Sequence, residues 1–214
     1  MTTTTTIFLC ILGFFLGSIP FGLIFTRLFF SIDLRKTGSG NIGATNARRA
    51  GGWKLGLATL VGDILKGAGP VLVAAVMTKN ATPALKDTVM ILTAIAAVFG
   101  HMFPVFLKFR PSGKGVATAA GGFAVISPVA LGAAIALFVS ALILFRRVSA
   151  GSLAAAATLP VFVFFFTHSG IFTGGALVIS LAIIFRHRDN IRRLMDGTEP
   201  KDRETDGRLK ADGD

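Results

Sequence analysis

A polar, glycine-rich stretch lies between two long apolar segments and reads Thr37-Gly-Ser-Gly-Asn-Ile-Gly-Ala-Thr-Asn-Ala-Arg-Arg49. Its three glycines let the backbone turn tightly and approach a ligand closely. Ser, Asn and Thr side chains add small hydrogen-bonding groups, and Arg48 and Arg49 carry forked donors that suit phosphate. The stretch indicates a site for a phosphate-bearing ligand. The alternative is a polar loop between membrane helices, with arginines that only set orientation.

A second basic stretch, Lys108–Thr118, holds Lys114 between two glycines at the expected start of a helix. Free N–H groups and the positive end of the helix dipole make such a position an anion site in its own right. The stretch resembles part of a nucleotide-binding P-loop, but the match fails. Lys108 stands where that motif needs Gly, and Gly115 stands where it needs Ser or Thr.

A third basic stretch, Arg186–Glu199, would place His187, Asn190 and Arg193 on one face of a helix. Such a polar strip could contact a substrate. The alternative is an ordinary helix end whose basic residues face lipid headgroups. Because all three stretches lie at the same predicted membrane face, together they indicate an anionic substrate that is handled at the membrane surface.

The composition of the 214-residue chain is that of an integral membrane protein, with 52% hydrophobic residues and a mean hydropathy of +0.70. Several segments approach the roughly 20 apolar residues that span a bilayer. The single Cys10 excludes an intrachain disulfide and gives no metal signature, so we expect no metal and no cofactor. The basic residues behind the net charge of +11 flank apolar segments. This placement favours anionic lipid headgroups over a nucleic-acid partner.

The apolar segments predict an all-α integral membrane protein with seven transmembrane helices, the N-terminus outside and the C-terminus in the cytoplasm. The run at 116–145 is long enough for one crossing or two. If the first polar loop is cytoplasmic, two crossings with a turn at Ser127-Pro128 also place the arginines at 146–147 and 186–193 there, as the positive-inside rule favours. The predicted spans are Ile7–Phe30, Leu55–Met77, Val89–Leu107, 116–127, 128–145, Gly151–Thr167 and Ile171–Phe185.

The polar segments complete this topology. The first polar loop is expected over Leu34–Lys54, and the second basic stretch forms a loop on the same side. A helix over 116–127 would be only about 18 Å long against a hydrocarbon core of about 30 Å, which predicts a thinned cytoplasmic face open to water and headgroups. We predict one membrane domain, residues 1–199, and a polar, disordered tail, residues 200–214.

Polar residues inside the spans are a further signal. Ser18, Pro20 and Gly22 interrupt the first span and allow a kink or a close helix approach. Asp63 and Lys66 lie three residues apart in the second span. Charges at membrane depth are rare and are candidates for function. A structural ion pair and a role in the site are equally good explanations.

The residue inventory excludes several kinds of chemistry. No Ser, His and acid are suggestively spaced, and no histidine is followed five residues later by aspartate, as in a common acyltransferase class. Before residue 196 only Asp33, Asp63, Asp87 and Asp189 are acidic, which argues against a carboxylate pair for acid–base work. A site rich in Arg, Lys, Ser, Asn and Thr suits a substrate that supplies its own reactivity. An activated acyl donor and a phosphate-bearing nucleophile would fit.

Five segments together resemble the bacterial membrane acyl-phosphate:glycerol-3-phosphate acyltransferases, over residues from about 7 to 199. One departure concerns the lysine, which this family usually precedes with two glycines. Here Ser112 replaces the first, with Pro111 ahead of it, so the anion contacts of this loop are expected to differ. The matching segments are Gly17-Ser-Ile-Pro-Phe-Gly22, Ser39-Gly-Asn-Ile-Gly-Ala-Thr-Asn46 with Arg49, Gly100-His-Met-Phe-Pro-Val-Phe106, Gly113-Lys-Gly-Val-Ala-Thr118 and His187 through Glu199.

The resemblance implies a multi-pass protein of the bacterial inner membrane with its active site on the cytoplasmic face. The implied reaction transfers a fatty acyl group from acyl phosphate, not coenzyme A, to the 1-hydroxyl of glycerol 3-phosphate. Lysophosphatidic acid and inorganic phosphate would be the products, as in the first acylation of phospholipid synthesis. Membrane lipid surrounds such an enzyme, and association with the enzyme that makes acyl phosphate is left open.

The resemblance also implies roles for individual residues. Ser39, Arg49 and Lys114 are expected to be catalytic, and only spacing favours Arg49 over Arg48. The residues expected to contact substrate are Gly40, Asn41, Gly43, Thr45, Asn46, His187, Asn190 and Glu199.

Two rival classes remain on the sequence alone. A small transporter of organic phosphate could use the same basic loops as a vestibule, but it predicts an internal repeat that the chain does not show. A purely structural lipid-binding subunit explains the charge but not three polar loops, two of them glycine-rich.

Overall fold

The computed structural model describes residues 3–201, in which all regular structure is helical. Of the predicted tail, only residues 200 and 201 are among those described, so the prediction of disorder there is not tested. The helices are α1 (Thr3–Gly17), α2 (Phe21–Phe30), η1 (Leu34–Lys36), α3 (Ala44–Met77), α4 (Pro83–Met102), η2 (Val105–Leu107), α5 (Val116–Ile126), α6 (Pro128–Phe145), α7 (Val148–Thr167), α8 (Gly170–Arg186) and α9 (Arg188–Met195).

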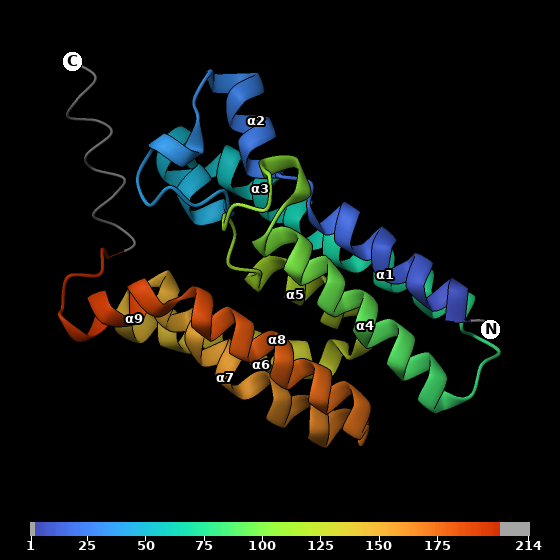
Figure 1. The fold of residues 1–214 in the computed structure, drawn as a ribbon. Helices are drawn as coiled ribbons and strands as arrows, with labels where there is room; N and C mark the ends of the chain where they lie inside the picture. The colour runs from blue at the N-terminus through green and yellow to red at the C-terminus, as the bar shows by residue number, and fades with distance from the viewer. Residues whose placement is uncertain (1–2, 202–214) are drawn as a thin grey trace, which may run out of the picture.

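The long helices lie side by side in a bundle with two distinct ends (Figure 1). At one end, which we call the basic end, Arg186 of α8 contacts the α4–α5 loop and Arg147 before α7 contacts the segment after α9. At the opposite end, the Ser169 hydroxyl before α8 donates to an Asp87 carboxylate oxygen of α4 at 2.7 Å. All three predicted polar stretches therefore meet at the basic end.

Membrane insertion is evident from length and composition. Within residues 3–201, five helices are long and apolar enough to cross a bilayer, and a sixth span results if α8 and α9, which meet at 58°, are taken together. With 11 residues, α5 is shorter than a span. Each predicted span coincides with helix, but the count of seven crossings and the orientation of the termini stay predictions.

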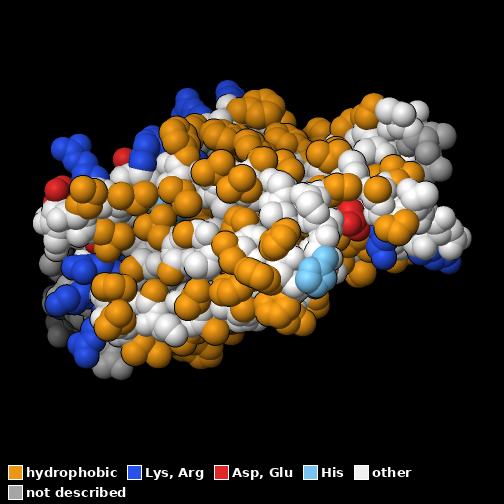
Figure 2. Space-filling model, turned by 90° about the horizontal axis from the view of Figure 1, so that it is seen from below, with side chains coloured by type: hydrophobic (Ala, Val, Ile, Leu, Met, Phe, Trp, Pro, Cys, Tyr) orange, Lys and Arg blue, Asp and Glu red, His pale blue; other side chains and the backbone are white. Residues whose placement is uncertain are grey.

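Hydrophobic side chains cover the middle of the face shown in Figure 2, and many of its Lys and Arg side chains lie toward one end. On α6 only 11% of the most apolar window is buried inside the protein. Soluble proteins rarely expose large continuous apolar surfaces. The exposed apolar surface of this protein therefore indicates that lipid surrounds it.

The helix breaks follow proline and small polar residues, as expected. The predicted interruption of the first span is confirmed, since α1 ends at Gly17 and α2 begins at Phe21. The predicted turn in the long apolar run is also present, because Ser127 caps α6 and Pro128 occupies its first turn. Proline suits that position, where its missing N–H has no helical partner to lose.

The predicted first loop, Leu34–Lys54, is wrong from Ala44 onward, where α3 begins. The helix is broken at Gly51 and at Gly52, whose φ of 84° lies in the left-handed region. A short helical arm at 44–50 therefore precedes the long part of α3. The third span begins earlier than predicted, at Pro83 and not at Val89, whereas its predicted end at Leu107 agrees with the span that α4 and η2 form together.

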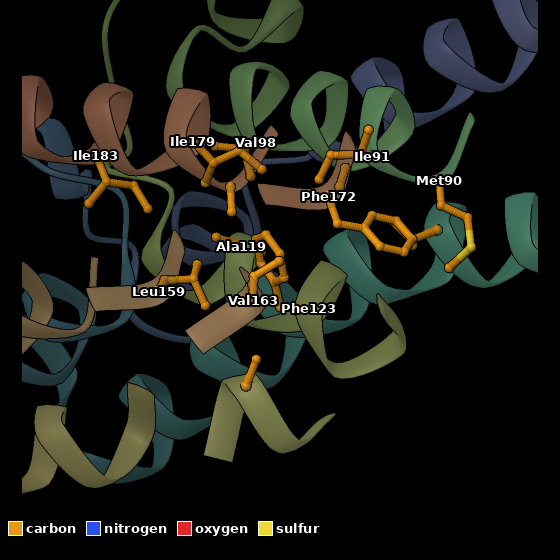
Figure 3. Packing of buried hydrophobic residues seen from close by; sticks show 14 of the residues in the cluster. Met90, Ile91, Val98, Ala119, Phe123, Leu159, Val163, Phe172, Ile179 and Ile183 are labelled. Carbon is orange, nitrogen blue, oxygen red and sulfur yellow. The ribbon is translucent and has the colours of Figure 1, made fainter. Parts of the chain in front are cut away.

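The buried core lies among α4, α5, α7 and α8 (Figure 3). Phe123 of α5 is fully buried in this cluster, which also holds Val98 of α4, Val163 of α7 and Ile179 of α8. Glycines bring α3 and α5 together, because Gly67 lies directly against the Thr118 carbonyl. Small residues at such contacts allow the close helix packing that is typical of membrane bundles.

Candidate active site

The glycine-rich stretch folds around the buried side chain of Asn46, which is 3% exposed. Its amide nitrogen donates to the carbonyl oxygens of Leu34, Thr37 and Asn41 at 3.1, 3.1 and 2.8 Å. Its amide oxygen accepts from the Ser39 backbone N–H at 3.2 Å. Asn46, predicted to contact substrate, is thus occupied by the loop itself, and we assign it the role of holding that loop in shape.

The rest of this stretch divides between backbone turns and exposed groups. Gly38 and Gly40 have φ of 53° and 68°, which other residues rarely adopt, so glycine is required for the turn. The Asn41 side chain accepts from the Gly43 N–H at 2.8 Å and closes a local turn before α3. Ser39 lies at the exposed tip. The turn therefore presents Ser39 outward while Asn41 supports the backbone.

The lysine loop, residues 108–115, joins α4 to α5. Its backbone is fixed to the end of α4, because the Ser112 N–H donates to the Met102 carbonyl at 3.0 Å. Gly115, with φ of 87°, starts α5. The Lys114 ammonium nitrogen donates to the Asn190 side-chain oxygen at 2.5 Å. Two predicted site residues that lie 76 positions apart are therefore in direct contact.

The third stretch bends at His187, between α8 and α9. The His187 ring is 2% exposed, and its Nδ1 lies 2.8 Å from the Ile183 carbonyl oxygen. A carbonyl can only accept, so Nδ1 carries the proton and the neutral ring keeps Nε2 as an acceptor. The predicted helical face is only partly right, because the bend separates His187 from the regular part of α9.

Glu199 anchors this stretch to the rest of the bundle. One carboxylate oxygen accepts from the Ser149 hydroxyl at 2.7 Å and from the Asn190 amide at 2.6 Å. The other accepts from Arg193 Nε at 2.7 Å, and the Glu199 carbonyl accepts from Arg147 Nε at 2.9 Å. Glu199 was predicted to contact substrate, but both oxygens already have protein donors. We assign it instead to orienting Asn190.

Lys114 lies in a strongly positive environment. Burial lowers the pKa of the Lys114 ammonium to about 8, Glu199 opposes this change, and the charges of Arg193, Arg186 and Arg49 reinforce it. Four cationic side chains therefore come close enough to act on one another, although like charges repel. Such a cluster is stabilised by a bound polyanion, and phosphate is the natural candidate. The charge of Arg49 in the first stretch acts on Lys114, and the choice of Arg49 over Arg48 as the catalytic arginine stays a prediction.

Arg186 is a site residue that the sequence did not single out. Its Nε donates to the Gly113 carbonyl at 3.0 Å, and its guanidinium lies 5.9 Å from the centre of the Phe103 ring. Ser149 and Arg147 were missed as well, although they fix Glu199. No local signal could have found them, because their partners lie 50 or more positions away along the chain.

A family model for glycerol-3-phosphate acyltransferase matches residues 7–197. The chain belongs to the glycerol-3-phosphate acyltransferase family. The enzyme of that description from Syntrophotalea carbinolica is 46% identical over 87% of this chain and 92% of its own. The one from Geotalea daltonii is 45% identical over 92% and 97%, and the one from Geobacillus kaustophilus 40% identical over 92% and 95%.

Solved structures of family members agree with the fold. PlsY, an integral membrane glycerol 3-phosphate acyltransferase, superposes in its glycerol 3-phosphate form with a TM-score of 0.84 and 38% identity, over 92% of this chain and 95% of that one. Its lysophosphatidic acid form gives a TM-score of 0.82 and 37% identity. Family membership makes the chain an acyltransferase of the membrane and decides against the transporter and the purely structural subunit.

Proposed function

We propose that this protein transfers a fatty acyl group from acyl phosphate to the 1-hydroxyl of sn-glycerol 3-phosphate, releasing inorganic phosphate and forming lysophosphatidic acid. The observation that carries the proposal is that the charges of Arg49, Arg186 and Arg193 all act on the partly buried Lys114 ammonium. Both substrates bear phosphate, so the reaction brings two anions together. Forked guanidinium groups and a lysine are suited to hold them.

Glycerol 3-phosphate is placed beside the third stretch. His187 and Asn190 lie one helical turn apart at the bend, and Asn190 already contacts Lys114. Its amide is aimed by Glu199, so that its oxygen faces the lysine. This arrangement lets Lys114 meet the phosphate of one substrate while His187 accepts a hydrogen bond from a glycerol hydroxyl.

The donor phosphate acts as the base in the proposed mechanism. The Glu199 carboxylate has its oxygens occupied by Ser149, Asn190 and Arg193, so it is not available to take a proton. As the glycerol hydroxyl attacks the acyl carbon, its proton passes to the departing phosphate, and the C–O bond to that phosphate breaks. Lys114 and Arg49 stabilise the negative charge that develops, which is the main contribution of a preorganised site.

The acyl chain has an apolar cavity within reach of the lysine. A narrow cavity of about 80 Å³ lies between α5, α6 and α7, and Val116, two residues after Lys114, lines it. Ala155 of α7 lines it as well. A larger apolar groove of about 600 Å³, beside Trp53 and Lys54, opens on the outer surface of α2 and α3. We place the acyl chain along this cavity, which must widen to hold a long chain, because Val116 in its lining follows Lys114 by two positions.

The test uses the purified protein in detergent or lipid mesophase with labelled glycerol 3-phosphate and long-chain acyl phosphate, with acyl coenzyme A as the parallel donor. Lysophosphatidic acid and phosphate should form from acyl phosphate alone. Lys114→Ala should then lower kcat by about 10²-fold or more, on the pattern for a preorganised charge.

The outcomes separate the parts of the proposal. Product from acyl coenzyme A alone would overturn the donor assignment but not the acyltransferase. Near-normal turnover by Lys114→Ala would remove the charge role of that residue. Thr158→Ala on α7 is the control, because this partly buried hydroxyl donates only to the backbone of its own helix, at 2.8 Å. It should keep full activity.

A further inference from the structure

A buried charged cluster lies beneath the lysine loop and takes no part in the chemistry proposed above. We call it the buried triad: Asp63 and Lys66 of α3 and His101 of α4. The Lys66 ammonium is 2.7 Å from an Asp63 carboxylate oxygen, so the ion pair expected from their spacing is present. His101 Nδ1 lies 3.6 Å from the same oxygen. All three side chains are 4% exposed or less.

One explanation of this buried ion pair is a purely structural role, in which it only holds helices together. The desolvation penalty of such a pair is large, so burial alone is weak evidence of a stabilising role. The position of the histidine ring is more specific. Its far edge, at Nε2, lies directly against Gly113, and a Cβ added at Gly113 would overlap that ring. Lys114 is the next residue.

The contact with the His101 ring is the reason why residue 113 is glycine. Gly113 is not among the residues with positive φ, so its backbone conformation would accept any side chain. The three atoms nearest to an added Cβ all belong to the His101 ring. The lysine loop therefore contacts the ring directly at Gly113. The position of the His101 ring consequently fixes the position of the loop backbone.

A second contact holds Gly113 from the other side. The Arg186 Nε of α8 donates to the Gly113 carbonyl at 3.0 Å. The glycine is thus enclosed between His101 and Arg186, and the Lys114 side chain starts from a fixed point toward Asn190.

The triad also connects the loop to the first span. The Lys66 ammonium donates to the Ile19 carbonyl at 2.8 Å, in the break between α1 and α2. Beside it, the Ser18 hydroxyl accepts from the Val105 N–H at 3.4 Å, at the start of the chain leading to the lysine loop. The break in the first span, the ion pair and the loop form one connected structure.

We propose that His101, which lies beside the Asp63–Lys66 ion pair, is the positioning residue of the lysine loop. Its ring supports Gly113 and thereby sets the distance between the Lys114 ammonium and the substrate phosphate. The inference rests on the proposed role of Lys114.

A double-mutant cycle between His101 and Gly113 tests it. Gly113→Ala pushes the loop off the ring and should lower kcat/KM for glycerol 3-phosphate about 10²-fold, the effect of a displacement near 1 Å in an active site. His101→Ala removes the support and should lower it about tenfold. In the double variant the added methyl group meets no ring, so the loss should stay within about threefold of that of His101→Ala.

The controls separate positioning from folding. Gly174→Ala on α8 adds a methyl group that meets nothing within 4 Å, so it should be silent alone and simply multiplicative with His101→Ala. Thermal unfolding should show that each variant is folded at the assay temperature, so that the kinetic coupling reports the position of Lys114 and not the folded fraction. If His101→Ala does not fold, His101→Asn, which has a polar side chain near Asp63, takes its place in the single and double variants.

The outcome is decisive in either direction. A double variant that loses the full product of the single effects, about 10³-fold, would overturn the proposal, as would a near-normal Gly113→Ala enzyme. The same cycle is also read in the Kd of glycerol 3-phosphate by calorimetry. If the wild-type protein turned over no acyl phosphate, the proposed function would fail, while this binding cycle would still decide the role of His101.

Discussion

A titration of Lys114 by pH tests the central feature of the site. Burial, together with Arg193, Arg186 and Arg49, lowers the pKa of Lys114 from 10.5 to about 8. The ammonium is the form that neutralises phosphate, so kcat/KM should be highest below that pH and fall about tenfold per pH unit above it. About 1.5 pH units above the pKa, only about 3% of the lysine is charged, and kcat/KM should be about 30-fold below its plateau.

The assay follows phosphate release at saturating acyl phosphate across about pH 6 to 10, with non-enzymatic hydrolysis subtracted. Lys114→Arg is the matched control, because a guanidinium stays protonated over this range. Its plateau should be lower, since arginine does not reproduce the contact with Asn190, but its alkaline limb should vanish. The substrate phosphates titrate on the acid side and do not mimic this limb. The reasoning is refuted if Lys114→Arg shows the same limb, or if the wild-type profile is flat throughout.

Two further predictions concern the cavity and the anchor. Ala155→Leu narrows the cavity between α5, α6 and α7, so it should lower turnover of a long-chain acyl phosphate about tenfold and leave that of a short-chain one unchanged. Ala157→Leu, at an exposed position of the same helix, is the control. Equal losses of turnover for both donors would show that the acyl chain binds elsewhere. Glu199→Gln should lower the free energy of unfolding by about 1–3 kcal/mol, measured by denaturation in detergent, because it removes an acceptor of Arg193. It should also move the alkaline limb of Lys114 to lower pH, since Glu199 raises that pKa; an unchanged midpoint would contradict the assignment.

Much of the fold could be predicted because bilayer insertion depends on local composition. A run of apolar residues identifies a span regardless of its partners, and proline marks helix breaks because it lacks an N–H donor. The breaks after Gly17 and at Ser127 were located on those grounds. The boundary at Ala44 was missed because polar residues on a short helical arm look like a loop when their tertiary contacts are unknown.

The residue types of the site could also be predicted, but the division of labour among them could not. Asn46 and Glu199 have the chemistry of ligand-binding residues, yet their hydrogen-bonding groups are used within the protein. Asn46 bonds within its own loop, whereas Glu199 reaches Ser149 across 50 positions. Which polar group faces a ligand depends on what packs around it, and a pattern of residue types does not contain that information.

By itself, the sequence determined that the chain enters a membrane, where it bends, which three stretches are rich in groups suited to phosphate and which family they resemble. These properties depend on composition, short-range spacing and motif. Tertiary structure alone decided that Lys114 meets Asn190, that Arg186 and His101 enclose Gly113, and that burial among arginines lowers the pKa of the lysine. Hydrogen bonds and electrostatic fields act over a few ångströms of space, and helices distant in the chain come that close only after they pack.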